Sequence, residues 1–137
     1  MPTDAREISG WMFSGAGDQG LDPQGDQLGV GGTNHPGKLV FLCAEDVENG
    51  RLIAGRTEIQ RWEWNHVVFV RDGDAVQVYL NGQIEIETQS AANLVDRMRQ
   101  LFFGGRCDNQ SNWEGRLDEI AMFNRALSVT EIEKLSE

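Results

Sequence analysis

One stretch of the sequence, Trp64–Glu87 (WNHVVFVRDGDAVQVYLNGQIEIE), is rich in β-forming residues and alternates between apolar and polar side chains. In its second half the aliphatic residues all carry even numbers: Val76, Val78, Leu80, Ile84 and Ile86. A strict period of two is typical of strands with one buried face and one solvent-facing face. The stretch therefore predicts three consecutive antiparallel strands, on which the rest of the chain must pack.

The turn between the second and third of these strands is marked by Asn81-Gly82, a strong hairpin signal. A two-residue loop made of this pair would turn Ile84 away from the face that carries Val78. A three-residue loop that starts at Leu80, with Gly82 in the left-handed region, keeps all the apolar residues on one face. We therefore expect the three-residue loop.

Shorter β-rich segments, separated by Gly, Asp and Asn, predict further strands on both sides of this block. They are residues 8–13, 27–30, 38–44, 51–54, 100–104 and 116–124, and Ile59–Trp62 leads into the three-strand block. Ser128 and Glu131 have the spacing of a capping box, which predicts a helix start. Val129, Ile132 and Leu135 then form an apolar stripe, so this short helix must dock on the strands.

About nine or ten short strands followed by one helix predict an all-β fold, an antiparallel two-sheet β-sandwich of the jelly-roll type. The length of 137 residues predicts a single domain over residues 1–137. The net charge of −10 argues against a nucleic-acid or anionic-lipid surface. No apolar run approaches the ~18 residues of a membrane span, so we expect no membrane insertion.

The two cysteines, Cys43 and Cys107, match neither a redox pair nor a zinc site in their spacing. Cys43 lies in the strand-like run KLVFLC, where a small buried hydrophobic residue fits. Either both thiols are free or the two form one disulfide bond. The chain also opens on polar residues without the apolar core of a secretory signal, as a mature domain of an exported protein would.

Several short motifs occur in a fixed order along the chain. They are Ile8–Trp11 (ISGW), Trp64–Val68 (WNHVV), Tyr79–Gly82 (YLNG), Phe102–Gly104 (FFG), Gly115–Ile120 (GRLDEI) and Asn124–Ser128 (NRALS) followed by Glu131-Ile132. Together they resemble the LamG-like jelly-roll domains of the concanavalin A-like lectin/glucanase superfamily. The resemblance runs from about Ile8 to Leu135 and implies a binding or adhesion module at an extracellular or cell-surface location.

The resemblance also raises a question about the edge of the sheet. Members of the family usually have one or two further strands before the I-S-x-W strand, whereas seven residues precede it here. We expect either a chain that lacks these N-terminal strands or a sheet with an exposed edge that another chain completes. A homodimer through such an edge is one hypothesis.

For carbohydrate binding, an aromatic platform flanked by amide and carboxylate groups is required. The candidates on predicted turns are Trp62, Trp113, Asp108, Asn109, Gln110 and Asn112. The family resemblance places an apolar residue at the position of Trp113, so this side chain is also expected to cover the edge of the core. Trp62 and Trp64 share one strand parity, so one of them is expected to be partly exposed.

One structural calcium ion is a further expectation, and it rests on the resemblance. In related jelly rolls an aspartate near the C-terminus joins backbone carbonyls around calcium, and Asp118 has the matching position. Carboxylate and carbonyl oxygens are the ligands that calcium prefers. The alternative is that Asp118 accepts hydrogen bonds from turn or strand N–H groups.

Catalytic residues are not evident in the sequence. Hydrolases of the superfamily place carboxylates on one strand as E-x-D-x-x-E, and the nearest approach here is Glu85 with Glu87. We therefore expect a non-catalytic binding or adhesion module that recognises a carbohydrate or protein ligand, as part of a larger extracellular protein. The alternatives are a structural spacer packed beside a catalytic domain and a glycoside hydrolase.

Overall fold

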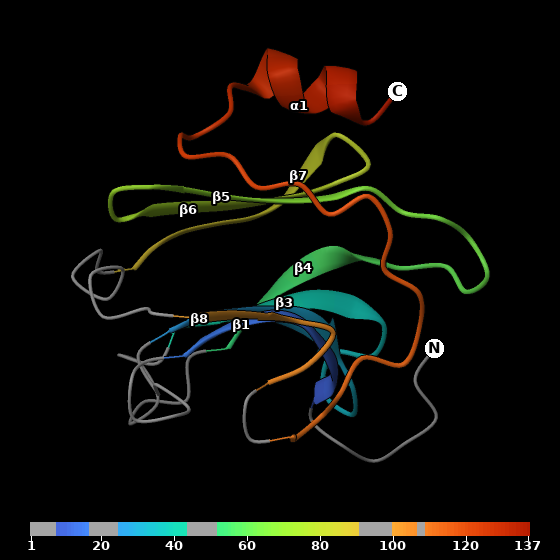
Figure 1. Cartoon of the computed structure of the whole chain (residues 1–137). Helices are drawn as coiled ribbons and strands as arrows, with labels where there is room; N and C mark the ends of the chain where they lie inside the picture. Colours follow the sequence, from blue (N-terminus) through green and yellow to red (C-terminus); the bar gives the residue numbers. More distant parts are fainter. Residues whose placement is uncertain (1–7, 17–24, 44–51, 91–99, 107–108) are drawn as a thin grey trace.

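Two antiparallel sheets stack face to face in a computed structural model of the chain (Figure 1), which describes residues 8–16, 25–43, 52–90, 100–106 and 109–137. The elements are β1 (Ile8–Ala16), β2 (Asp26–Gly31), β3 (Lys38–Cys43), β4 (Ile53–Glu58), β5 (Val67–Asp72), β6 (Ala75–Leu80), β7 (Gln83–Gln89), β8 (Gln100–Phe103) and α1 (Val129–Leu135). One sheet has the order β4-β3-β2-β1-β8 and the other the order β5-β6-β7. The predicted antiparallel β-sandwich with a short C-terminal helix is confirmed.

The main core fills the space between the two sheets. Its buried residues are Leu28, Val30, Leu39 and Phe41 from the five-stranded sheet and Val76, Val78, Leu80 and Ile86 from the three-stranded sheet. The ring of Phe69 on β5 lies between Phe13 and Phe41, with centroid distances of 5.0 and 5.7 Å. The period-two pattern of the sequence thus correctly identified the inward face of β6.

The predicted three-residue loop between β6 and β7 is wrong. Leu80 pairs with Gln83, and Asn81 and Gly82 both have positive φ, at 50° and 80°, as a two-residue type I′ turn requires. The register then shifts between the pairs of Tyr79 and Val78, which leaves Glu85 as an extra residue in β7. This bulge returns Ile86 to the core face, whereas Ile84, before the bulge, lies on the opposite face, so the even-numbered pattern holds for Ile86 but not for Ile84.

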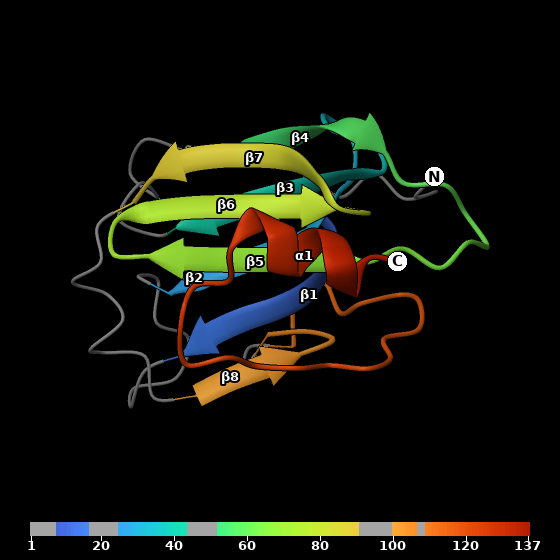
Figure 2. The same cartoon turned by 90° about the horizontal axis from the view of Figure 1, so that it is seen from above.

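The outer face of the three-stranded sheet is also covered, although the alternating sequence pattern predicted that this face is exposed to solvent. Helix α1 lies over this face (Figures 1 and 2), and its Ile132 packs with Val70 and Tyr79 in a second buried cluster. Ile84 joins this cluster rather than the main core. Of the predicted helical stripe only Ile132 is buried, while Val129 and Leu135 are half exposed. No helix in the described part of the chain is long and apolar enough to cross a membrane.

The strand predicted over residues 116–124 is also wrong. This segment runs along one side of the sandwich without strand pairing, and Glu119 interrupts its extended backbone with a φ of 51°. Residues 59–66, which lead into β5, form an irregular loop. The hypothetical Cys43–Cys107 bond lies outside the described residues, because Cys107 and the side chain of Cys43 are not among them.

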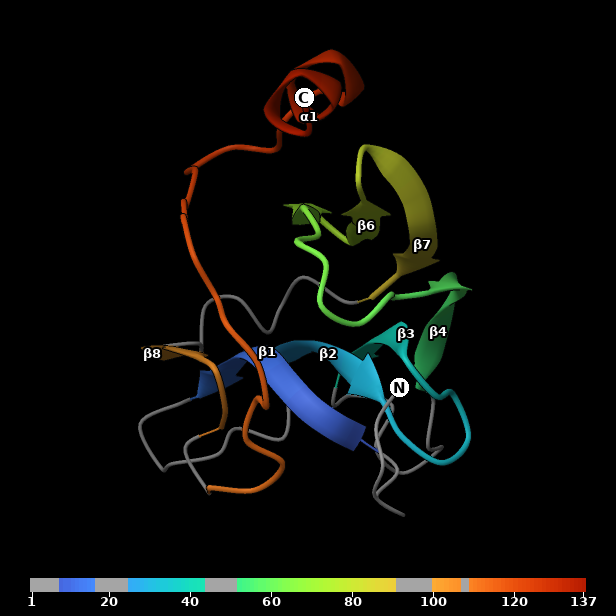
Figure 3. The same cartoon turned by 90° about the vertical axis from the view of Figure 1, so that its right-hand side faces the viewer.

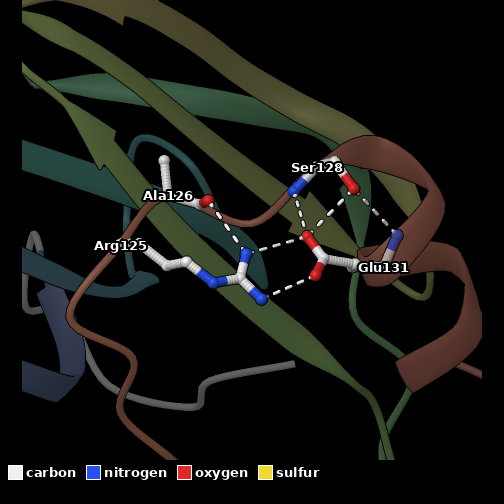
Figure 4. A network of polar contacts seen from close by, with 4 residues as sticks. All are labelled: Arg125, Ala126, Ser128 and Glu131. Carbon is white, nitrogen blue, oxygen red and sulfur yellow. Dashed lines mark hydrogen bonds and ion pairs between the residues drawn. The ribbon is translucent and has the colours of Figure 1, made fainter.

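The capping box at the start of α1 is confirmed and extended by an arginine (Figure 4). The carboxylate of Glu131 accepts a hydrogen bond of 2.8 Å from the backbone N–H of Ser128, whose Oγ accepts one of 3.4 Å from the N–H of Glu131. The guanidinium of Arg125 donates to both oxygens of the same carboxylate, at 2.6 and 3.0 Å. One carboxylate thus links the incoming chain to the first helical turn.

This network predicts a pH dependence of the helix. Hydrogen bonds from Arg125 and then from Ser128 lower the pKa of Glu131 from 4.5 to about 2. Because the folded state favours the ionised carboxylate, its contribution is complete above the unfolded pKa and is lost as the pH falls toward 2. We expect an NMR titration of the Glu131 side chain to give a midpoint near 2, and Arg125→Gln to raise it. A midpoint near 4.5 in the unmodified chain would show that the network does not form.

Candidate functional site

The most exposed aromatic side chain of the described residues, Trp62, lies on the loop of residues 59–66 that connects the two sheets. Its side chain is 99% exposed and that of Trp64 is 69% exposed. Trp62 also has a φ of 67°, which is rare for a bulky residue and unfavourable by about 1–3 kcal/mol. Strained backbone of this kind is concentrated at functional sites, so the loop is the main candidate for ligand contact.

The C-terminal end of this loop is fixed by the turn between β6 and β7. Asn81 accepts a hydrogen bond from the backbone N–H of His66 through its Oδ1 and donates its own N–H to the carbonyl of His66, both at 2.8 Å. Its Nδ2 also donates to Oδ1 of Asn65, and Asn65 donates to the carbonyl of Glu63. The asparagine of the hairpin signal therefore both forms a turn and anchors the exposed loop.

The N-terminal end of the loop is attached to the five-stranded sheet. The backbone N–H of Ile59 donates a 2.8 Å hydrogen bond to the carbonyl of Gly37, and the Ile59 side chain packs against the main core. With both ends held, only the tip around Trp62 projects into solvent. A ligand that stacks on this indole meets a surface whose backbone is already ordered, which reduces the entropy lost on binding.

The other predicted ligand residues lie on the loop that follows β8. Nδ2 of Asn112 donates to Oδ1 of Asn109 at 2.7 Å, and both side chains are exposed, as is Gln110. Trp113 is partly buried, lies against Gly10 of β1 and packs on the main core, as expected for a residue that covers the core edge. Asp108 lies outside the described residues.

The structure does not bring the predicted carbohydrate residues together. Figures 1 and 3 show the loop of Trp62 (green) between β4 and β5, whereas the loop after β8 (orange) lies beside the five-stranded sheet. Asn109 and Asn112 form one polar group, and Trp62 with Trp64 forms a separate aromatic one. The amides predicted from the sequence therefore do not flank the platform at Trp62, whose polar neighbours along the loop are Arg61 and Glu63.

The side chain of Asp118 takes part in a local hydrogen bond. Oδ1 of Asp118 accepts the backbone N–H of Glu119 at 2.9 Å, the turn role that was the alternative. Within the described ranges no group of three or more His, Cys, Asp or Glu side chains is placed to hold a metal ion. Calcium binding at Asp118 therefore stays a prediction.

Of the two carboxylates on β7, Glu85 and Glu87, Glu85 has a structural role. Glu85, the bulged residue, accepts hydrogen bonds from the backbone N–H groups of Arg56 and Thr57 at 2.6 and 2.9 Å and from Thr57 Oγ1 at 2.7 Å. Burial raises the pKa of Glu85, but these hydrogen bonds outweigh it and lower the pKa overall. A carboxyl group held ionised in this way is poorly suited to act as the general acid of a glycosidase, and its oxygens are occupied by three hydrogen bonds within the domain.

The role of Glu85 was missed from the sequence. The Glu85 carboxylate also lies close to Gly55 on β4: a Cβ added there would be 2.9 Å from Oε2, so a larger residue would have to displace this side chain. Gly55 and Glu85 are far apart in the sequence, and their contact became recognisable only when the two sheets were placed.

A model of the concanavalin A-like lectin/glucanases superfamily matches residues 2–133. The chain belongs to this superfamily. The match confirms the resemblance that the ordered motifs indicated, and the stacked sheets are those of its β-sandwich. The functional residues of this concanavalin A-like domain must still be argued from its own surface.

Comparison with individual proteins adds to the fold only. No curated protein matches this concanavalin A-like domain significantly. Among solved structures it is similar to an S-layer domain-containing protein from Clostridium thermocellum, with 22% sequence identity and a TM-score of 0.50. The alignment covers 98% of this domain and 66% of that chain, just under two thirds of its length.

Proposed function

We propose that this concanavalin A-like domain is a non-catalytic module of a larger extracellular or cell-surface protein and that it binds a carbohydrate through Trp62. The observation that carries the proposal is the almost fully exposed indole on a loop whose two ends are anchored. The superfamily includes lectins by its description, and the similar S-layer domain-containing protein supports a surface location.

The chemistry of the loop favours a neutral glycan. The flat face of an indole packs against the C–H face of a pyranose ring, while Arg61 and Glu63 provide a donor and an acceptor for hydroxyl groups. The net charge of −10 disfavours polyanionic ligands, because such ligands would be repelled at long range. A protein ligand and a spacer role are the competing outcomes of the test.

The proposal is tested on a glycan array with the purified domain, first in calcium and then in EDTA. We expect binding that survives EDTA and that Trp62→Ala weakens about tenfold, equivalent to about 1.4 kcal/mol. The melting temperature of Trp62→Ala should stay equal or rise, because the indole makes almost no contacts and alanine is less strained at this φ.

Phe123→Ala is the matched control, because it removes an exposed ring on a different segment. It should leave glycan binding unchanged. Equal binding by Trp62→Ala and the unmodified domain would refute the platform, and binding lost only in EDTA would transfer the site to a calcium centre and Asp118. No binding in either condition would favour a protein ligand or the spacer.

A further inference from the structure

The two long sides of the sandwich differ in whether hydrogen bonds connect the edge strands of the two sheets. On one side β7 and β4 are joined by the hydrogen bonds of Glu85 to Arg56 and Thr57. On the other side β5 ends the three-stranded sheet and β8 ends the five-stranded sheet. Figure 2 shows both edges on the side along which the chain runs from β8 to α1. We call this side the open side.

The backbone of β5 presents hydrogen-bonding groups to the open side. Asp72 and Ala75 flank a two-residue turn, so they form a hydrogen-bonded pair, and bonded pairs recur at every second residue. The bond from the N–H of Asn81 to the carbonyl of His66 fits this alternation. The N–H and C=O groups of Val67 and Phe69 therefore point away from β6, toward the open side.

A long segment passes beside this edge without pairing to it. Residues 115–127, which we call the strap, make no backbone–backbone hydrogen bond with the described parts of either sheet. Its large apolar side chains are exposed by between 38% and 67%: Leu117, Ile120, Met122 and Phe123. An irregular connection of this length is uncommon in a compact domain, and such an apolar row marks an interaction site more often than chance.

We propose that the open side accepts one extended strand of a partner polypeptide, which pairs with β5 and is covered by the strap. The N–H and C=O groups of Val67 and Phe69 that point away from β6 match an extended backbone, as in recognition by strand addition. The exposed apolar side chains of the strap would pack against the side chains of the added strand. This inference is independent of the glycan site at Trp62, which lies on another loop.

Charge decides which strand fits. The strap itself has no net charge, with Asp118 and Glu119 against Arg116 and Arg125, but the whole chain has a net charge of −10. A strand in which Lys or Arg alternates with apolar residues is therefore complementary. A second copy of this chain carries the same net charge and is repelled, so self-pairing is disfavoured.

The test uses the full chain and a synthetic peptide of about nine residues in which Lys alternates with Val, long enough to span the six residues of β5. In the free domain the amide hydrogens of Val67 and Phe69 should exchange faster than those of Val68 and Val70. With the peptide, the exchange of Val67 and Phe69 should slow about tenfold or more. A peptide with Pro at its centre should fail to protect them, and one with Glu in place of Lys should bind more weakly.

Two variants separate strap contacts from folding. Met122→Asp alters a side chain that is 67% exposed, so it should leave the melting temperature unchanged and weaken peptide binding about tenfold. Val129→Asp, at the start of α1, is the matched control and should leave binding unchanged. Protection of Val67 and Phe69 in the free monomer would overturn the proposal, because the edge would already be occupied. Protection that appears only with a concentration-dependent dimer in light scattering would replace it with self-association, and absence of protection with the peptide would also refute it.

Discussion

Replacement of Asp26 by alanine is expected to lower the free energy of unfolding by about 3–5 kcal/mol. Nε and Nη2 of Arg71 donate to the two carboxylate oxygens of Asp26 at 2.6 and 2.5 Å, and the side chains of Arg71 and Asp26 are only 11% and 5% exposed. Asp26 begins β2 and Arg71 belongs to β5, so this ion pair joins the two sheets. Without the carboxylate, the guanidinium is left in a largely buried place with one negative partner removed.

Arg71 remains bonded to other groups in this variant, since its Nη1 also donates to the carbonyls of Gly73 and Ser90 at 3.0 and 2.9 Å. These bonds do not neutralise its charge, which is why a large loss is expected. Urea denaturation of the single variants and of Asp26→Leu combined with Arg71→Met provides the comparison. The double variant should be more stable than Asp26→Ala, because it removes both charges and keeps much of the volume. A loss below about 1 kcal/mol in Asp26→Ala would show that the pair behaves as an exposed one.

Ile132→Ala is expected to destabilise the domain by about 2–4 kcal/mol, whereas Leu135→Ala should change stability by less than about 0.5 kcal/mol. Both residues belong to the apolar stripe of α1, but Ile132 is 1% exposed and Leu135 is 50% exposed. Ile132 fills the space above Val70 and Tyr79, so its truncation leaves a cavity under the helix. Seven residues cannot sustain a helix without such docking.

The measurement for this pair is chemical denaturation followed by circular dichroism, together with the near-ultraviolet signal of the domain's single tyrosine, Tyr79, and its tryptophans. In Ile132→Ala the helix should detach and part of the signal should be lost before the sandwich unfolds. Equal effects of the two substitutions would mean that α1 does not dock through Ile132.

The strands were predictable where burial imposes a local rule. Along β6 every second residue faces the main core, so Val76, Val78 and Leu80 revealed the strand and its inward face without further information. The capping box was equally local, because Ser128 and Glu131 are three positions apart and bond to each other. Features of this kind depend on residues that are close together in the sequence, so they can be predicted from one sequence alone.

Errors arose where a distant segment decides the outcome. The extra residue at Glu85 compensates for the short turn, and it is held by β4, which the alternation of β7 does not reveal. Tyr79 counted as a solvent-facing residue because the side chain that covers it, Ile132, comes from the end of the chain. The segment 116–124 has a strand-like composition, but a strand also needs a paired neighbour, and the described residues offer it none.

The candidate site was predictable only in part. Trp62 was predicted as a candidate platform and its ring is exposed, although the parity of Trp62 and Trp64 assumed a strand where the structure has a loop. The polar partners were assigned to the loop of Asn109 and Asn112, because amides and aromatics were grouped by residue type. The relative positions of these amides and of Trp62 depend on how the two sheets are arranged, and the spacing of residues in the sequence does not reveal this arrangement.

The carboxylate of Glu85 has a consequence for growth of the sheets beyond one molecule. Fibrils that extend by edge-to-edge pairing need free strand edges on every copy, and each blocked edge removes one way in which copies can pair. Here two N–H groups of β4 are occupied by a side chain of the same molecule, and the bulge distorts β7 where it would receive a neighbour. Among the described residues, the side chain of Glu85 and the bulge make addition of a neighbouring strand at β4 or β7 unfavourable, whereas β5 and β8 end the two sheets without such a block.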